Sequence, residues 1–108
     1  MDIEHTLFLM TTRPRMFVIN ASGMYHFYSG VFSQKRESGI SKDNEANLLV
    51  CFLEWKKKAL GVNNPEDLFN FYDTMENEDG LACMAKDLLY VYKTILPSYI
   101  HPADRPYQ

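Results

Sequence analysis

The sequence has few of the residues from which local metal or cofactor sites are usually built. It contains 2 cysteines and 3 histidines, and its 5 glycines are scattered singly, so it has no glycine-rich phosphate loop. His5, His26 and His101 lie far apart, and neither cysteine has a partner at the spacing of zinc ligands. Helical Glu-x-x-His pairs, which mark carboxylate-bridged metal sites in bundles, do not occur. We therefore predict no metal and no cofactor.

The cysteines also lack the surroundings of a catalytic nucleophile. Cys51 and Cys83 both fall in predicted helices among apolar neighbours, with no local feature that would lower the pKa of either thiol. They are interpreted as small hydrophobic residues in a reducing compartment and not as a disulfide. His26 lies opposite the apolar stripe of its segment, as a solvated histidine would. We predict that the protein is not an enzyme.

Long apolar runs and an excess of positive charge are missing as well. No stretch of 18 apolar residues occurs, and the first residues lack the basic leader and long apolar region of a signal peptide. The net charge of -3 argues against direct binding to nucleic acid. The simplest expectation is a cytoplasmic protein with no membrane segment.

Amphipathic segments of helical period fill most of the chain instead. Short connections between such segments predict antiparallel neighbours, so we expect residues 1–108 to form one all-α domain, a compact bundle of four to five helices. Residues 97–108, with three prolines, are expected to form an extended tail. For 2–12 the pattern favours a helix and leaves a short strand open. The remaining predicted helices span 22–36, 44–60, 64–76 and a segment from Glu78 or Asp79 to the residue before Pro97.

Several boundaries have recognisable signals. Pro14 closes the first segment, and Ser22 is the predicted N-cap of the second. Asn64 followed by Pro65 is the clearest helix start in the chain. Asp43 is the expected cap of the helix over 44–60, which Gly61 should end.

The apolar pattern also predicts what is buried. Met16–Ile19 presents four consecutive apolar side chains that we expect in the core. The helix over 44–60 has the widest apolar arc and is the predicted centre of the bundle. Gly30 lies in mid-helix, which suggests close approach of another helix, or else a kink. The predicted buried stripe of the second helix consists of Met24, Phe27, Tyr28, Val31 and Phe32.

Positive charge forms no stripe, whereas negative charge is concentrated. Lys56–Lys58 fans around its helix and is interpreted as a solvated helix end. Six of the 14 acids lie between residues 66 and 79, where there is no Lys or Arg, so this window carries -6. Placement at helix N-termini accounts for four of them, but not for Asp73 and Glu76, which end a helix. We predict a partner-binding acidic patch made of Asp73, Glu76, Glu78 and Asp79.

One combination of short motifs resembles a known group of proteins. It comprises Arg13-Pro14-x-Met16-Phe17-Val18, Phe27 with Gly30, Phe52-Leu53-Glu54-Trp55, and Glu78-Asp79-x-Leu81-Ala82 before the last apolar helix. Over roughly residues 7 to 96 the chain resembles small helical bacterial proteins with an Arg-Pro-x-Met-Tyr/Phe motif. Immunity proteins of polymorphic toxin and contact-dependent growth-inhibition systems belong to that group. The resemblance implies an intracellular antidote that binds a cognate toxin domain, often a nuclease, and blocks its active site or substrate cleft.

A second class of function fits the same composition and the same acidic patch. A small helical regulatory protein, or a phage-derived inhibitor, would act on a host protein complex in place of a toxin. The identity of the bound partner separates the two classes. The sequence leaves self-association undetermined.

Overall fold

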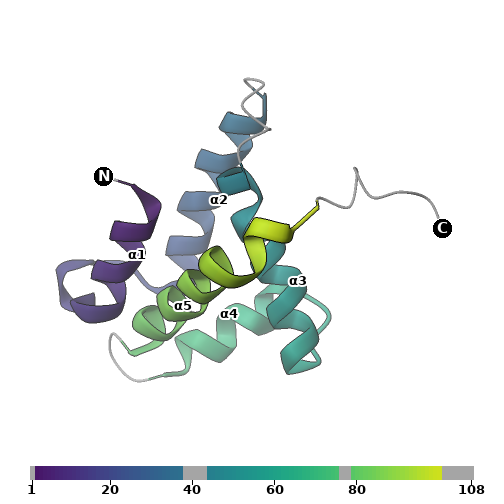
Figure 1. Ribbon diagram of the computed structural model, residues 1–108. Coiled ribbons are helices and arrows are strands. Elements are labelled where there is room, and N and C mark those ends of the chain that lie inside the picture. Colours follow the sequence, from purple (N-terminus) through teal and green to yellow (C-terminus); the bar gives the residue numbers. More distant parts are fainter. Residues whose placement is uncertain (1, 38–43, 76–78, 101–108) are drawn as a thin grey trace.

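The computed structural model describes the backbone of residues 2–37, 44–75 and 79–100 and the side chains of 2–32, 45–75 and 79–100. Within these ranges the chain forms α-helices joined by 3₁₀ turns and short irregular segments, with no strand (Figure 1). The predicted all-α bundle is confirmed, and the segment predicted over 2–12 is a helix from Ile3 to Thr12 and not a strand. The helices are α1 (Ile3–Thr12), α2 (Ala21–Glu37), α3 (Leu48–Leu60), α4 (Pro65–Asp73) and α5 (Asp79–Tyr90).

Polar side chains placed one residue before a helix define three of the helix starts. The Asp2 carboxylate accepts a hydrogen bond from the backbone N–H of His5 at 2.7 Å, and Asn64 accepts one from Asp67 at 2.9 Å. Asn64 and Pro65 therefore act as predicted. Ser22 is not the cap of α2, because the helix begins one residue earlier and the amide of Asn20 accepts from the N–H of Gly23 at 2.8 Å. Asparagine caps as well as serine does, and this earlier start makes Ala21 part of the buried face.

The helix over 44–60 has the predicted end but a different beginning. Gly61 adopts a left-handed conformation with φ 71°, and its N–H binds the carbonyl of Lys57, which stops α3 as predicted. Residues Asn44–Asn47 form a 3₁₀ turn, and α-helical geometry begins only at Leu48. The expected cap Asp43 lies outside the described residues.

The last helix changes its geometry along its length. After Tyr90 the chain continues as a π turn over Val91–Ile95 and a 3₁₀ turn over Leu96–Ser98. The expectation of an extended tail from residue 97 is therefore wrong for Pro97 and Ser98, because proline fits the first positions of a helical turn. The wide turn brings Val91 and Leu96, five residues apart, into the core together. Residues 101–108 of the expected tail lie outside the described residues.

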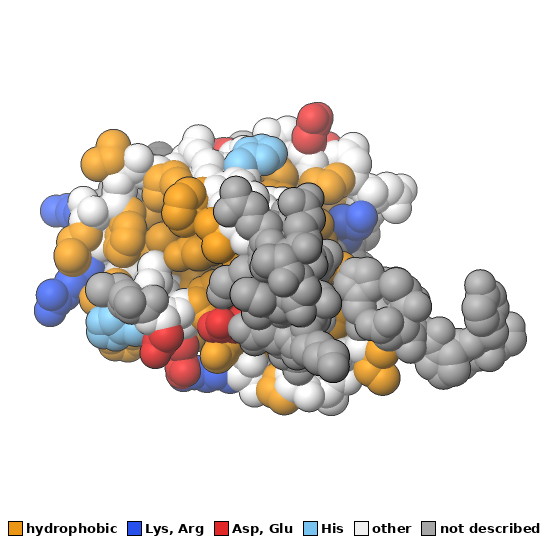
Figure 2. All heavy atoms as spheres, turned by 90° about the horizontal axis from the view of Figure 1, so that it is seen from above, with side chains coloured by type: hydrophobic (Ala, Val, Ile, Leu, Met, Phe, Trp, Pro, Cys, Tyr) orange, Lys and Arg blue, Asp and Glu red, His pale blue; other side chains and the backbone are white. Residues whose placement is uncertain are grey.

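Several apolar side chains that the pattern places in the core lie at the surface. Met16 and Val18 are exposed, while Phe17 and Ile19 pack against the core. Because the backbone leaving Pro14–Met16 is extended, successive side chains point to opposite sides, and only alternate ones can be buried. Phe27 is 61% exposed, at the edge of the α2 stripe. Viewed from the end where α2 finishes, hydrophobic side chains form a continuous area at the surface, with charged groups mostly around its edge (Figure 2).

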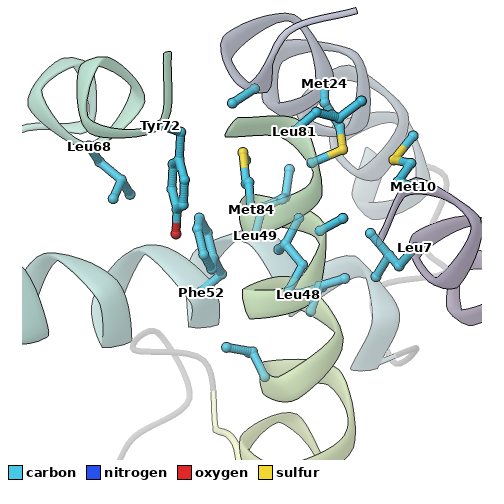
Figure 3. Packing of buried hydrophobic residues seen from close by; sticks show 14 of the residues in the cluster. Leu7, Met10, Met24, Leu48, Leu49, Phe52, Leu68, Tyr72, Leu81 and Met84 are labelled. Atoms are coloured by element: carbon cyan, nitrogen blue, oxygen red, sulfur yellow. The ribbon is translucent and has the colours of Figure 1, made fainter. Parts of the chain in front are cut away.

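The centre of the bundle is α5 and not, as predicted, the helix over 44–60. α5 packs against each of the other four helices, most extensively against α1. Figure 3 shows α5 between Leu7 and Met10 of α1 on one side and Phe52 and Tyr72 of α3 and α4 on the other. Its inner face consists of Gly80, Leu81, Met84, Ala85 and Leu88.

Two small residues on that inner face explain why α5 takes the central place. Gly80 leaves room for the backbone of α4, because an added Cβ would overlap the carbonyl oxygen of Tyr72, and Ala85 is fully buried. The wide apolar arc of α3, in contrast, is only partly buried, because Ala59 in its last turn is exposed.

Candidate partner-binding groove

A groove of about 580 Å³ runs between α2 and α4. Each helix contributes residues at the spacing i, i+3, i+4 and i+7, so a single stripe of each helix forms one wall. The lining residues are Ser22, Tyr25, His26 and Ser29 of α2, and Pro65, Glu66, Phe69, Asn70 and Asp73 of α4.

Aromatic rings join the two walls. The ring centroids of Tyr25 and Phe69 lie 4.6 Å apart with the planes inclined at 47°, and the His26 ring lies 5.8 Å from Phe69. Phe69 is itself buried, which fixes the position of this contact. Partial burial raises the pKa of the Tyr25 hydroxyl above its ordinary value, so the hydroxyl is neutral at physiological pH and can both donate and accept hydrogen bonds.

The groove is negatively charged. Glu66 and Asp73 stand seven residues apart on the same stripe of α4, and both are exposed. None of the described residues that line the groove is Lys or Arg. Asp73 also borders a second, smaller hollow of about 240 Å³, where α4 ends beside Gly80 and the segment Ile19–Ala21. The carboxylates therefore face an open surface that a cationic group can approach.

The structure describes half of the acidic patch predicted from sequence. Asp73 is the last residue of α4 and Asp79 the first of α5, and both are exposed. Glu76 and Glu78 lie outside the described residues. Glu66 is one of the four acids explained by their position at a helix N-terminus, and it shares the groove with Asp73. Because residues seven apart lie on the same face of a helix, the sequence could have predicted that Glu66 and Asp73 face the same side.

The contribution of α2 to the groove had no comparable signal. Tyr25 and His26 lie outside the predicted buried stripe of their helix, and nothing local to them indicates that α4 is their neighbour. Only the packing of α2 against α4 brings these residues opposite Glu66 and Asp73.

A second polar cluster joins α3, α4 and α5, and Lys56 is its cation. The Lys56 ammonium lies 3.0 Å from the Asp87 carboxylate, and the Tyr72 hydroxyl donates a hydrogen bond to the same oxygen at 2.6 Å. The Lys56 side chain is only 14% exposed and lies 5.4–5.7 Å from the ring centroids of Trp55, Phe71 and Tyr72. The interpretation of Lys56–Lys58 as a solvated helix end is thus wrong for Lys56. Its long stem packs over the rings while its charge is neutralised by Asp87.

The polar groups of this cluster bind one another. Burial, together with the hydrogen bond to Asp87 and its negative charge, raises the pKa of Tyr72 above the ordinary value. Burial and the charge of Asp87 also raise the pKa of the nearby Cys83 thiol, although Lys56 and Lys86 act in the opposite direction. Both groups therefore keep their protons at neutral pH. The cluster holds three helices together.

Cys51 is buried and Cys83 is half-buried, and neither forms a disulfide within the described residues. Within the described ranges, no three His, Cys, Asp or Glu side chains come together in a way that could hold a metal ion. In the same part of the chain, no helix combines the length and apolar character needed to cross a membrane.

Comparison with protein-family models, with curated proteins and with solved structures found no match.

Proposed function

We propose that this protein binds a basic segment of a partner protein in the acidic groove between α2 and α4. We further propose that the partner is a toxin domain, as the resemblance of the sequence to immunity proteins implies, and that binding occludes its active site or substrate cleft. The observation that carries the proposal is the combination of Glu66 and Asp73 with the Tyr25–Phe69 ring contact in one groove.

The chemistry of the groove suits an arginine or lysine side chain. A guanidinium can form two charge-assisted hydrogen bonds with a carboxylate while its plane lies against an aromatic ring. The carboxylates would accelerate association, and rings that become buried in the complex would supply much of the affinity. If the toxin is a nuclease, its substrate cleft is cationic, and Glu66 and Asp73 would occupy positions that phosphates otherwise take.

The first experiment identifies the partner. The tagged protein is used to capture binding proteins from its native cell in moderate salt, followed by mass spectrometry. Recovery of the C-terminal domain of a large secreted protein, one that kills cells lacking this chain, supports the antidote function. Recovery of polymerase, ribosome or a host defence complex instead supports the alternative class, a regulator or inhibitor of a host complex.

The second experiment tests the groove itself with a pair of matched variants. Glu66→Lys and Asp67→Lys make the same change of charge at neighbouring exposed positions in the first turn of α4, but only Glu66 lines the groove. We expect Glu66→Lys to slow association with the captured partner at least about tenfold in low salt and Asp67→Lys to slow it less. Equal effects of the two variants would count against the groove.

The acidic patch predicted from sequence is tested separately. Lysine replacements at Asp73, Glu76, Glu78 and Asp79 should weaken or slow binding if the negative surface continues past the groove toward α5. An unchanged association rate and affinity would contradict a role for this patch. A loss with this variant but not with Glu66→Lys would place the docking surface at the α4–α5 junction.

A further inference from the structure

The groove between α2 and α4 has a fixed order of chemical groups along its length. Asp73 lies close to Ala21, because both border the smaller hollow at the start of α2. About one turn farther along each helix, the rings of Tyr25 and Phe69 are in contact. About one turn farther again along α4, Glu66 lines the same groove. A carboxylate therefore stands at each end of the groove, with aromatic rings between the two.

Helix geometry sets the distance between the two carboxylates. Glu66 and Asp73 are seven residues apart in α4, and an α-helix rises about 1.5 Å per residue, so their positions lie about 10 Å apart along the helix axis. Both residues are exposed, whereas Phe69 is buried and Tyr25 is half-buried. The charged ends of the groove are thus open to a partner, and the rings lie at its base.

We propose that the groove recognises an α-helix of the partner protein, one that carries two basic side chains seven residues apart and an aromatic side chain midway between them. This inference rests on the proposed function, which assigns a basic segment of a partner to the groove. The two basic residues pair with Glu66 and Asp73, and the central side chain contacts the rings of Tyr25 and Phe69.

The charges along the groove call for a cation at both ends of the bound helix. Among the described residues, no Lys or Arg lines the groove, so each carboxylate there can accept a cation from another molecule. A guanidinium at each end would form charge-assisted hydrogen bonds with its carboxylate. Between the ends, the exposed amide of Asn70 and the protonated hydroxyl of Tyr25 can bind polar groups of the same helix.

The spacing favours a helix over an extended segment. Any α-helix has the same rise as α4, so its residues at i, i+4 and i+7 share one face at nearly the intervals of Glu66, Phe69 and Asp73, whichever way it runs. On one face of an extended strand, side chains recur about every 6.6–6.8 Å. Two basic residues that flank a central residue on that face are therefore about 13 Å apart, which exceeds the separation along α4.

The probes are synthetic peptides of about 20 residues, long enough to form a helix in water when they are rich in alanine. The matched peptide has arginines at i and i+7 and a tyrosine at i+4. The control peptide has the same composition, but its second arginine is at i+5, about 140° around the helix from the first. Circular dichroism checks that the two are equally helical. A third, threonine-rich peptide presents arginine, tyrosine and arginine at alternate positions of an extended chain.

Binding of each peptide to the full chain is followed by nuclear magnetic resonance of the backbone amides in low salt. The shifts should be concentrated along the groove, and the matched peptide should bind at least about fivefold more tightly than the control. Glu66→Gln and Asp73→Asn should each remove most of this difference. Asp67→Asn changes a neighbouring exposed acid outside the groove and should leave the affinity unchanged.

A cycle of substitutions in both molecules tests whether each arginine pairs with one carboxylate. Replacing one arginine of the matched peptide with alanine should make its binding insensitive to either Glu66→Gln or Asp73→Asn, and leave it sensitive to the other. Circular dichroism of the protein variants checks that they are folded. Both substitutions keep the shape of the side chain and remove only its charge.

Equal affinities of the matched and control peptides, or tighter binding of the extended peptide, would overturn the inference. A matched peptide that does not bind at about 1 mM, or whose shifts avoid the groove, would overturn it as well. These outcomes leave the proposed function standing, because Glu66→Lys tests the groove with the captured partner whatever the shape of the bound segment. If the peptides behave as expected but Glu66→Lys does not affect the captured partner, the proposed function is contradicted instead.

Discussion

Two helical glycines, Gly80 in α5 and Gly30 in α2, stand in opposite surroundings. At Gly80 the backbone of α4 crosses so closely that a Cβ would overlap the Tyr72 carbonyl oxygen. At Gly30 a Cβ would meet none of the described atoms within 4 Å. The first glycine is required by the fold, whereas the second weakens its helix and contacts nothing in the part of the chain that the structure describes. The helix around Gly80 is therefore closely packed, whereas α2 is exposed around Gly30.

The charged groups divide between the two regions in the same way. Around α5, Lys56 forms an ion pair with Asp87, and Tyr72 donates a hydrogen bond to the same carboxylate. Between α2 and α4, Glu66 and Asp73 face an open groove. Some charges stabilise the fold and others remain accessible to a partner. Helix packing, and not position in the sequence, decides which charges belong to each group.

The largest effect is expected from Gly80→Ala. The new methyl group would push α4 and α5 apart at backbone atoms that cannot move individually, since the carbonyl carbon of Tyr72 would also lie only 3.0 Å away. We expect a loss of about 3 kcal/mol in the free energy of unfolding, measured by urea denaturation. A change below about 1 kcal/mol would show that the two helices separate easily.

A somewhat smaller loss is expected from Asp87→Ala. This variant leaves the Lys56 ammonium and the Tyr72 hydroxyl without their shared acceptor, in a site where the Lys56 and Asp87 side chains are only 14% and 22% exposed. The expected loss in unfolding free energy is about 2 kcal/mol. Lys93→Ala is the control, because its ion pair with Glu4 at 3.3 Å is exposed and should contribute less than about 0.5 kcal/mol. Equal losses would contradict the distinction between the two pairs.

The raised pKa of Tyr72 predicts a loss of stability in alkali. The folded protein keeps a proton that the unfolded chain releases at the ordinary tyrosine pKa of 10.0, so the stabilisation is complete below pH 10 and is lost above it. Above pH 10, wild type should lose up to about 1.4 kcal/mol per pH unit relative to Tyr72→Phe, which has no proton to release. Parallel pH profiles for the two proteins would contradict this assignment.

The only gain in stability is expected from Gly30→Ala. Alanine adds helix propensity at a position where its methyl group meets none of the described atoms within 4 Å, so the free energy of unfolding should rise by about 0.5–1 kcal/mol. Denaturation by urea at low micromolar concentration measures it. A loss of stability would mean that a neighbour does occupy this space, and it would remove the contrast with Gly80.

Local patterns were sufficient to predict much of the fold. Helical periodicity identified the segments, and the Asn64–Pro65 start and the Gly61 stop were located correctly because caps act within a few residues of themselves. The Ser22 cap failed because Asn20 offered an equally good local alternative. Met16 and Val18 were misplaced because an apolar run does not reveal which of its alternate side chains faces the core.

The sequence by itself determined the all-α architecture, the approximate helices and the concentration of acids between residues 66 and 79. Tertiary structure alone decided that α5 is central, that Lys56 is paired, and that Glu66 and Asp73 share a groove with residues of α2. The physical reason is range: hydrogen bonds within a helix and its caps depend on neighbours a few residues away. Burial and the surroundings of a charge depend instead on which other helices pack against that position.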